Sequence, residues 1–518
     1  MHPRNPYASH PPDFQALAAF DPDNFGRHVR TRKDGRFYID FKDLQACKAL
    51  NEAILLHDFG IKVNQPADRL CPPVPNRLNY LLWLQDVLRE SKRPDGRPVV
   101  EFGGDEAARS LKSVASDSGA RMTKRMRVQS PDASTIRTLD IGTGATAIYP
   151  ILGCALSPHW TFDATEIDSE SLANAQTMID DPCNNGEAPA LACAQRRTAQ
   201  GPLQLKSRIR LILRTAEDTL IPTEDQNLQA SSELLYHCTM SNPPFYSSSE
   251  DLAESAAAKL LPPQSACTGT DGEMITPGGE VAFVTRQIEE SIVLGQRVLW
   301  YSSMLGKLSS VSTLLQTLKE KQIDNIAVTK FQQGQTGRWA IAWSLSPHRL
   351  PDWVGRSMGD TAASGWSTLV SSTSIFRTLP TGRFESLQQA EEALFKLLNS
   401  LDAAQVSPQE PEDPSSGRTV FVGLAYNVWN RAARRAAKAS AEATAITKVK
   451  PDVEPVLCLL ISLSQQRHRR TEVSATPASS SFSSSPPVEV KMQWTYGRSR
   501  LHFESFATML IRSLSSRG

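Results

Sequence analysis

The stretch Ile136-Arg137-Thr138-Leu139-Asp140-Ile141-Gly142-Thr143-Gly144 joins a short apolar run to a glycine-rich turn. Glycines at the end of a strand let the backbone turn tightly and approach a ligand closely. The amides at the start of the following helix can then bind the carboxylate of an amino-acid group. We therefore expect residues 136–144 to form a strand and the ligand-binding turn of an α/β sheet. The same turn also fits a simple strand-to-helix connection with no ligand.

Apolar runs alternate with helical patterns from this turn to about residue 345. Six further strands are expected, at residues 160–165, 208–213, 234–240, 297–304, 326–331 and 338–345. Helical patterns between them, such as 280–294 and 311–321, are typical of a mostly parallel sheet covered by helices. The link at 332–337 is too short for a helical crossover, so we expect the last two strands to form an antiparallel hairpin at one edge. The sequence predicts a seven-stranded Rossmann-like sheet.

The chain has 518 residues, which exceeds one ordinary domain. The C-terminal part predicts strands near 420–425, 456–463 and 488–494, followed by a helix, and hence a small α+β domain. We expect five parts: an N-terminal RNA-binding arm and helical module at 1–90, a flexible insertion at 91–134, the Rossmann-like domain at 135–346, a linker at 347–380 and the α+β accessory domain at 381–514.

Composition excludes several classes of protein. No apolar run reaches the ~20 residues of a membrane-spanning helix, and the N-terminus lacks the apolar core of a signal peptide, so we expect neither a membrane nor secretion. The eight cysteines are scattered without zinc spacing, which predicts no metal and no disulfide. The formal net charge is only +1, so local patches must hold any polyanion.

An acidic pair follows the second strand of the sheet, in Thr165-Glu166-Ile167-Asp168. An acid at this place accepts hydrogen bonds from ribose hydroxyls in the dinucleotide and methyl-donor versions of the fold. Glu166 is the better candidate because it directly follows the apolar run. Asp168 fits the role of a cap on the next helix instead.

The turn Asn242-Pro243-Pro244-Phe245 follows the fourth strand, where ligand crevices of such sheets lie. An amine conjugated to a base or an acyl group is a poor nucleophile because its lone pair is delocalised. The Asn242 side-chain oxygen and the Pro243 carbonyl can accept its two hydrogens, while Phe245 stacks on the planar substrate. Together with the glycine turn and Glu166, this set predicts a class I methyltransferase that uses S-adenosyl-L-methionine.

The chain resembles the adenine-N6 RNA methyltransferases, a family that includes the eukaryotic methyltransferase-like sixteen type, acting on U6 small nuclear RNA, and a bacterial ribosomal RNA type. The resemblance covers residues 1 to about 345, with insertions. It rests on the glycine turn, the Asn-Pro-Pro-Phe turn and several separate matches: Met1 to Tyr7, Pro11 to Phe14, Phe41 to Asp43, Asp58 to Gly60, Pro75 to Tyr80, Gly278 to Glu280, Trp300 to Lys307 and Gly337 to Ala340.

This resemblance implies site residues and a substrate. The donor pocket would include Arg77, Gly142, Glu166, Thr219 and Asn242, although the loop around Thr219 is longer here than in the family. A flipped adenine would be held by Asn242, Pro243, Pro244 and Phe245. The RNA surface would combine Arg4, Asn5, Tyr7, Lys307 and Arg338, each of which taken singly fits an ordinary surface position. The implied partner is a structured RNA with an accessible adenine, and the resemblance points to a small nuclear RNA.

Two other functions fit part of the pattern. A protein glutamine methyltransferase can use the same turn on an amide nitrogen, and a catalytically silent RNA-binding scaffold could keep the fold without the chemistry. Basic clusters at 124–127 and 467–470 permit nuclear entry, so we expect a nuclear location, with the cytoplasm as a second one. The basic stretch 431–438 fits either an RNA backbone or an exposed helix face.

Overall fold

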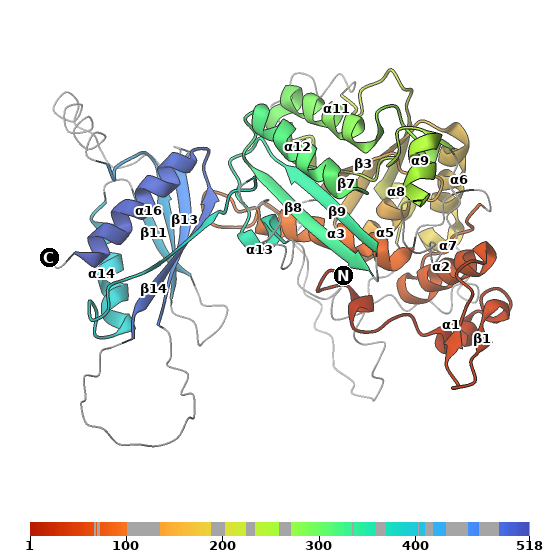
Figure 1. Ribbon diagram of the computed structural model, residues 1–518, viewed down its shortest axis with the longest axis horizontal. Coiled ribbons are helices and arrows are strands. Elements are labelled where there is room, and N and C mark those ends of the chain that lie inside the picture. The colour runs from red at the N-terminus through yellow and green to blue at the C-terminus, as the bar shows by residue number, and fades with distance from the viewer. Residues whose placement is uncertain are drawn as a thin grey trace. The chain divides into compact units, whose positions relative to one another are not determined.

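The computed structural model divides into two compact units, each described by itself (Figure 1). The first comprises Met1–Arg89, Val100–Leu345 and Ser357–Val370, and the second Glu90–Val99, Ser346–Arg356 and Ser371–Gly518. The structure describes residues 1–66, 69, 73–100, 135–187, 203–223, 234–257, 271–333, 336–357, 369–401, 404–409, 418–430, 454–465 and 486–516. The basic clusters predicted at 124–127, 431–438 and 467–470 lie outside these residues, as does most of the predicted insertion.

The first unit is built on a seven-stranded sheet with the order β5-β4-β3-β6-β7-β9-β8. Its strands are β3 (Ile136–Ile141), β4 (Trp160–Glu166), β5 (Ile209–Leu213), β6 (Tyr236–Ser241), β7 (Val298–Leu305), β8 (Ile326–Gln333) and β9 (Thr336–Trp343). Strands β3 to β7 pair in parallel, whereas β9 is antiparallel to both β7 and β8. The seven strands and the edge hairpin confirm the Rossmann-like fold predicted from the sequence.

Helices cover both faces of this sheet. They are α5 (Ile148–Leu156), α6 (Ser169–Asp180), α7 (Pro182–Asn185), α8 (Leu205–Arg208), α9 (Ser249–Ala257), α10 (Asp271–Met274), α11 (Gly279–Leu294) and α12 (Leu308–Glu320). Helices α11 and α12 pack together and against β7, where their apolar side chains and those of the strands form one core. The start of α6 shows the predicted cap, since Asp168 accepts the amides of Glu170 and Ser171.

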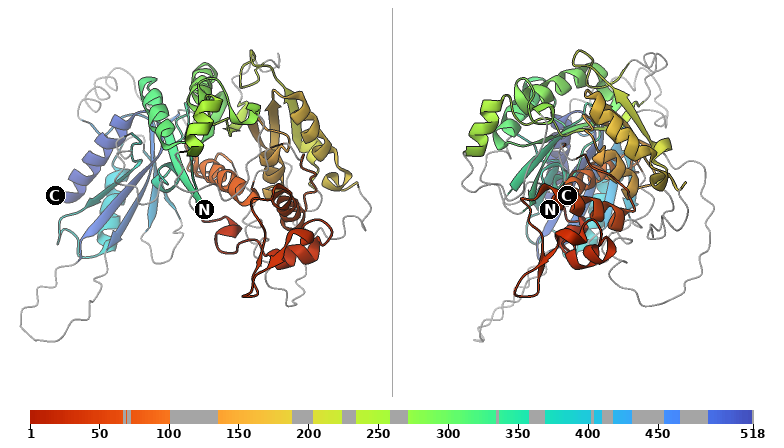
Figure 2. Two further views of the ribbon diagram at one scale, coloured as in Figure 1. Left: turned by 45° about the vertical axis from the view of Figure 1, so that its right-hand side comes forward. Right: turned by 90° about the vertical axis from the view of Figure 1, so that its right-hand side faces the viewer.

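The N-terminal module of the first unit contains two long helices, α2 (Leu44–Phe59) and α3 (Val74–Glu90). Smaller elements precede them: η1 (Pro6–Ala8), α1 (Phe14–Phe20), η2 (Gly26–His28) and the strands β1 (Arg30–Thr31) and β2 (Phe37–Tyr38). In Figure 2 the red N-terminal helices lie beside the yellow helices that follow β4, and the Lys62 amide donates to Asn184 of α7 (2.9 Å). On the sheet, Trp83 of α3 packs edge-on against Phe331 of β8.

The second unit is an α+β fold with a five-stranded antiparallel sheet, in the order β10-β14-β13-β12-β11. The strands are β10 (Ser374–Thr378), β11 (Ala404–Gln409), β12 (Thr419–Leu424), β13 (Leu457–Gln465) and β14 (Val488–Tyr496). Helices α14 (Leu387–Asn399) and α16 (Arg500–Ser515) pack on one face over a shared apolar core, and α13 (Asp352–Gly355) is a short turn of helix. The alternating residues of β14 place Val490, Met492 and Trp494 in that core.

Two predicted boundaries differ from the structure. The predicted linker 347–380 contains β10 and α13, which both belong to the second unit. Glu90–Val99, which holds the last residue of the predicted N-terminal module and the first residues of the predicted insertion, also belongs to that unit. Gly96 lies against the ring of Phe421, and the Cys458 thiol donates to the Pro94 carbonyl (3.5 Å), so this segment covers the sheet face opposite to α14 and α16.

Within the described residues, no helix combines the length and the apolar character that crossing a membrane requires.

Candidate active site

Three neighbouring strands bring the predicted site residues to one edge of the sheet. Ile141 of β3 is in register with Thr165 of β4 on one side and with Ser241 of β6 on the other. The residues that follow are therefore neighbours in space: the glycine turn after β3, Glu166 at the end of β4 and Asn242 after β6. Ligands of parallel α/β sheets bind at this edge.

The glycine turn has the shape of a cradle. Gly142 and Gly144 have φ angles of +73° and +69°, which favour glycine. In the part of the chain that the structure describes, no atom other than those of the chain neighbours lies within 4 Å of the position that a Cβ would take at either residue. The Glu166 carboxylate closes one side, because its Oε2 accepts the Gly144 amide (2.8 Å). Space for a ligand therefore lies directly on the backbone of the turn.

Asp140, the last polar residue before the turn, is buried with few hydrogen bonds to replace those it would make with water. Its Oδ2 accepts the Thr143 hydroxyl (2.8 Å), but its Oδ1 has no hydrogen-bond partner among the described residues. Burial raises the pKa of Asp140 to about 7; the Thr143 hydrogen bond opposes this, Glu166 reinforces it and Arg77 opposes it. A buried carboxyl group with a raised pKa destabilises the fold at neutral pH. Such groups are typical of functional sites.

Arg77 reaches the site from helix α3. Its guanidinium donates to the Tyr149 hydroxyl (3.1 Å) and lies 5.5 Å from the centre of that ring. Its Nε is buried and has no partner in the described part of the chain. The Tyr149 hydroxyl donates in turn to the Met304 sulfur of β7 (3.1 Å). Arg77 is therefore fixed beside Asp140, and its Nε–H stays available as a hydrogen-bond donor.

The Asn-Pro-Pro-Phe turn carries another free polar atom. The side-chain oxygen Oδ1 of Asn242 is buried and accepts no hydrogen bond from any residue that the structure describes. The ring of Phe245 lies against Gly306, where a Cβ would stand only 2.8 Å from the ring atom Cγ. The Arg338 guanidinium lies 5.2 Å from the centre of the same ring. A buried acceptor and an aromatic ring thus stand close together at the end of β6.

The loop after β7 is held in place beside this ring. Glu280, which is 2% exposed, accepts the Gly306 amide at Oε2 (2.6 Å) and the Lys307 amide at Oε1 (3.0 Å). Burial raises the pKa of Glu280, while these amide bonds lower it. The Lys307 ammonium pairs with both oxygens of Asp251 on α9 (2.7 and 2.9 Å) and lies 5.3 Å from the centre of the Tyr246 ring. The loop and α9 are therefore joined at the rim of the site.

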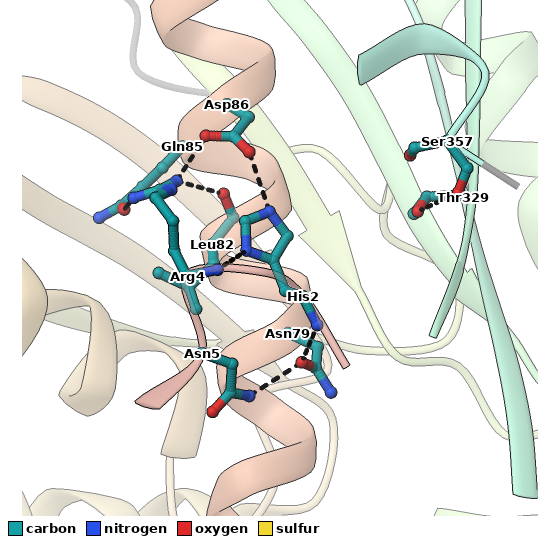
Figure 3. A network of polar contacts seen from close by, with 9 residues as sticks. All are labelled: His2, Arg4, Asn5, Asn79, Leu82, Gln85, Asp86, Thr329 and Ser357. Atoms are coloured by element: carbon teal, nitrogen blue, oxygen red, sulfur yellow. Dashed lines mark hydrogen bonds and ion pairs between the residues drawn. The ribbon is translucent and has the colours of Figure 1, made fainter. Parts of the chain in front are cut away.

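The three arm residues predicted to bind RNA are bonded within the first unit. Arg4 donates to Asp86 (2.5 Å) and to the Leu82 carbonyl (2.8 Å) of helix α3. Asn5 is 2% exposed and donates to Asn79 (2.8 Å), and the buried Tyr7 donates its hydroxyl to an aspartate of α2. Figure 3 shows the arm along α3, with His2, Arg4 and Asn5 facing the helix. These contacts dock the arm on α2 and on α3, the helix that carries Arg77.

Thr219, which is predicted to contact the methyl donor, lies in the loop after β5 and makes hydrogen bonds within that loop. Its hydroxyl donates to the Ile221 carbonyl (2.9 Å), and Arg214 donates to its carbonyl (3.1 Å). Glu290 of α11 accepts the next two amides, those of Leu220 and Ile221. The loop is well fixed, and a contact between Thr219 and the donor stays a prediction.

Three residues at the site were not predicted as site residues from the sequence. Tyr149 is an ordinary residue in its own segment, whereas Gly306 and Glu280 stood out only as part of the stretches that carry the family resemblance. Two exposed aliphatic side chains, Ile167 and Leu213, follow or end the strands β4 and β5. Exposed aliphatic residues next to an acid at the carboxyl ends of strands are a usable signal, because this edge binds flat, partly apolar ligands.

Comparison with known proteins gives a consistent family. A family model described as RNA methyltransferase matches residues 1–103 and 122–347. The human protein named RNA N(6)-adenosine-methyltransferase METTL16 is 34% identical over 348 residues, which cover 67% of this chain and 50% of that protein. The Schizosaccharomyces pombe protein named U6 small nuclear RNA (adenine-(43)-N(6))-methyltransferase is 33% identical over 320 residues, 62% of this chain and 65% of the relative. The chain spans about half the length of the vertebrate relatives it matches.

Solved structures give similar matches. The hMettl16 catalytic domain in complex with the MAT2A 3'UTR hairpin 1 has a TM-score of 0.48 and 32% identity, covering 67% of this chain and 95% of that one. The N-terminal domain of human METTL16 in complex with SAH has a TM-score of 0.45 and 30% identity, covering 67% of this chain and 98% of that one.

Proposed function

The chain belongs to the RNA methyltransferase family, and from this premise we propose that it transfers a methyl group from S-adenosyl-L-methionine to N6 of an adenosine in structured RNA. The names of its relatives specify this reaction, and one of them specifies U6 small nuclear RNA, which is the substrate we propose to test first. The observation that carries the proposal is the free, buried Oδ1 of Asn242 beside the Phe245 ring.

The residues of the glycine turn fit the methyl donor. The open space at Gly142 and Gly144 suits a close approach of the amino-acid group to the backbone. Arg77 and Asp140 each keep a buried polar atom without a partner among the described residues, and they would pair with the carboxylate and the ammonium of that group. Glu166 would accept the ribose hydroxyls. The donor, when bound, supplies an electrophilic methyl group.

Asn242 would act on the target amine. The N6 amine of adenine is conjugated to the ring, so its lone pair is poorly available. Hydrogen bonds from the amine to Asn242 Oδ1 and to the Pro243 carbonyl favour a pyramidal nitrogen whose lone pair points at the methyl group. The amine would react in its neutral form, so that the N–C bond would form as the methyl–sulfur bond breaks and the thioether leaves, and the extra proton on nitrogen would then pass to water. Pro244 keeps the turn extended. A group already buried without a partner needs no reorganisation for this task.

Phe245 would hold the base, and the rim of the site would hold the RNA. An adenine extruded from a loop can stack on the Phe245 ring, at an unstacking cost of a few kcal/mol that an unpaired base largely avoids. Arg338 lies over this ring and Lys307 lies at the rim, so both would be near the path of the phosphate backbone. The role that we propose for the arm residues Arg4, Asn5 and Tyr7 in RNA binding is indirect, through the docking of the arm on α3 and α2.

The first experiment incubates the full chain with methyl-labelled donor and either total RNA or a protein extract. Label in RNA that is recovered as N6-methyladenosine supports the proposal. Label in protein as methylglutamine would replace it with the glutamine methyltransferase, and donor binding without any transfer would leave a silent RNA-binding protein.

The second experiment maps N6-methyladenosine in cells that carry the wild-type chain or the Asn242→Ala variant. We expect one small nuclear RNA site to disappear, because the loss of one oriented acceptor costs on the order of a hundredfold in rate. The matched control is Asn427→Ala, the same substitution in the second unit, which should leave the map unchanged. A nuclear location, tested by fractionation, is proposed on the same grounds.

A further inference from the structure

Strands β6 and β7 stay side by side, but the ladder of backbone pairs between them has a gap at the end that carries the site. Their parallel pairing is recorded at Tyr236 with Val298 and at Cys238 with Trp300. Both strands continue further, β6 to Ser241 and β7 to Leu305. On the outer sides the sheet stays regular to the end, since β3 pairs with β6 up to Ser241 and β9 pairs with β7 up to Leu305. The gap lies directly before Asn242.

Side chains take the place of the missing ladder. The Ser302 hydroxyl donates to the Thr239 carbonyl (2.7 Å), which ties the two strands together. The Gln287 side-chain amide, from helix α11, donates to the Thr239 hydroxyl (3.1 Å) and to the Ser302 carbonyl (3.3 Å). The Ser241 hydroxyl donates to the Ser303 hydroxyl (2.9 Å). We call these five residues, Thr239, Ser241, Gln287, Ser302 and Ser303, the β6–β7 polar cluster.

All five side chains of the cluster are completely buried. Apolar residues would fill such a place at lower cost, because each buried polar group must regain in the protein the hydrogen bonds that it made with water. In return, a fully connected buried network fixes its members in one arrangement. The cluster therefore favours one exact position of β6 relative to β7, more than it favours stability.

The cluster is also anchored from the other face of the sheet. Alternation along β7 points Ser303 toward α11 and Ser302 toward α3. The buried Tyr80 hydroxyl of α3 bonds the Ser302 hydroxyl (2.8 Å). The next residue toward the N-terminus on α3, Asn79, holds the docked arm through Asn5. The end of β6 is thus held from both sides.

We infer that Gln287 is a positioning residue, which sets Asn242 against the target amine through the β6–β7 polar cluster. This inference rests on the proposed function. Ser241 directly precedes Asn242, so a shift of the strand end moves the amide oxygen with it. Gln287 lies in the core of the first unit, touches neither the glycine turn nor the Asn-Pro-Pro-Phe turn in any recorded hydrogen bond, and acts only through Thr239, Ser241 and Ser302.

The test is Gln287→Met in the full chain, which keeps the length of the side chain and removes its hydrogen bonds. We expect kcat to fall about ten- to a hundredfold, the loss that a displacement approaching 1 Å produces. The KM for a U6 RNA hairpin and the Kd for the donor, measured by calorimetry, should stay within about twofold. Hydrogen exchange of the amides at 239–247 should become faster in the protein alone.

The matched control is Ser291→Ala, one turn further along α11. Ser291 is equally buried, donates to the Ile288 carbonyl (2.6 Å) and accepts the Trp343 indole (2.9 Å), but it lies away from the gap between β6 and β7. The Ser291→Ala variant should be less stable than the wild type and should keep the wild-type kcat. If Gln287→Met does not fold, Ser303→Ala removes one member of the cluster and should show the same pattern more weakly.

The inference is overturned if Gln287→Met keeps wild-type kcat and exchange rates, or if both variants lose kcat in proportion to their loss of folded protein. Failure of the proposed function looks different. In that case the wild-type chain transfers no methyl group to RNA, while the exchange rates at 239–247 still show whether Gln287 fixes the end of β6.

Discussion

The contact between Gly306 and Phe245 predicts that a single added methyl group slows methyl transfer. A Cβ on Gly306 would lie 2.8 Å from Cγ and 2.9 Å from Cδ1 of the Phe245 ring. Ordinary contacts begin near 3.4 Å, so one side must withdraw by about 0.6 Å (3.4 minus 2.8). The loop cannot easily retreat, because Glu280 accepts the amides of Gly306 and Lys307. The Gly306→Ala variant should therefore displace the ring.

The magnitude follows from the displacement. A misplacement of 1 Å at an active site costs about a hundredfold in rate, so 0.6 Å should cost roughly tenfold in kcat. Gly306 does not have a positive φ angle, and backbone strain adds nothing to this effect. Stability should change little, because the contact lies at the rim of the fold. The loss should therefore appear in kcat and in the KM for RNA, with the donor Kd unchanged.

The assay is steady-state methyl transfer to a U6 RNA hairpin at saturating donor, with thermal melting of both proteins. Gly272→Ala is the matched control, because a Cβ at Gly272 meets no described atom within 4 Å. Wild-type kcat in Gly306→Ala at an unchanged melting temperature would refute the reasoning, since the ring would then tolerate the displacement or take no part in holding the base.

Three further predictions follow from charges and close contacts. Burial raises the pKa of Asp140 to about 7, so the folded protein keeps this proton up to about pH 7, and the fold loses stability as the pH rises from ~4 through 7. Asp140→Asn should therefore stabilise the fold relative to wild type more at pH 8 than at pH 5, by roughly 2–3 kcal/mol in thermal melts. Asp251→Asn should free Lys307, tightening RNA binding several-fold at low salt and steepening the log–log salt dependence by about one, as measured by filter binding. In the second unit, Gly96→Ala combines a φ of +83° with a Cβ 3.1 Å from the Phe421 ring, and should cost about 1–3 kcal/mol, read from hydrogen exchange in β12 and β13.

All strands of the first sheet and the central strands of the second could be predicted from the sequence, whereas the edge strands of the second sheet could not. Every strand of the first sheet and the long strands of the second are continuous or alternating apolar runs. Strands β10 and β11 are short and lie at the two edges of the second sheet, where their residues stay largely exposed. Strand β10, with its exposed Phe376, fell in the predicted linker, and the proline within β11 argued against a strand there; both are strands through their pairing with β14 and β12.

The residues proposed to face the ligand were also identifiable from the sequence, while those that support them were not. Asp140 and Glu166 lie at the ends of β3 and β4, and Gly142 and Asn242 directly follow β3 and β6, where local spacing identifies them. Gln287 and the serines of β7 act through contacts between distant segments, which no local pattern reveals. The two adjacent serines inside the otherwise apolar β7 were the available signal for such a contact, because a buried strand rarely has serine at two adjacent positions.

The N-terminal arm has structural contacts that its motif does not reveal. Its cationic and aromatic residues suggest direct contacts with RNA, which stays a prediction, but Asn5 and Tyr7 are buried and Arg4 is paired with Asp86. Arg4 and Asn5 hold α3, the helix that carries Arg77 and Tyr80, and Tyr7 bonds to α2. An arm that fixes α3 can affect both halves of the proposed site through this helix.

The polar groups around Asn242 are of two kinds, those with hydrogen-bond partners and those without, and this contrast supports the proposed position of the reaction. Behind the turn, the hydroxyls and the amide of the β6–β7 polar cluster are all bonded to one another. In front of it, Oδ1 of Asn242, Oδ1 of Asp140 and Nε of Arg77 are buried with no partner in the described structure. Such atoms also occur elsewhere among the described residues, at Arg4 Nε and Thr495 Oγ1, but these three come from three separate elements and meet at the edge where the glycine turn and the Asn-Pro-Pro-Phe turn lie. The fold bears the cost of burying them there, as expected if the proposed donor and adenine amine supply the partners.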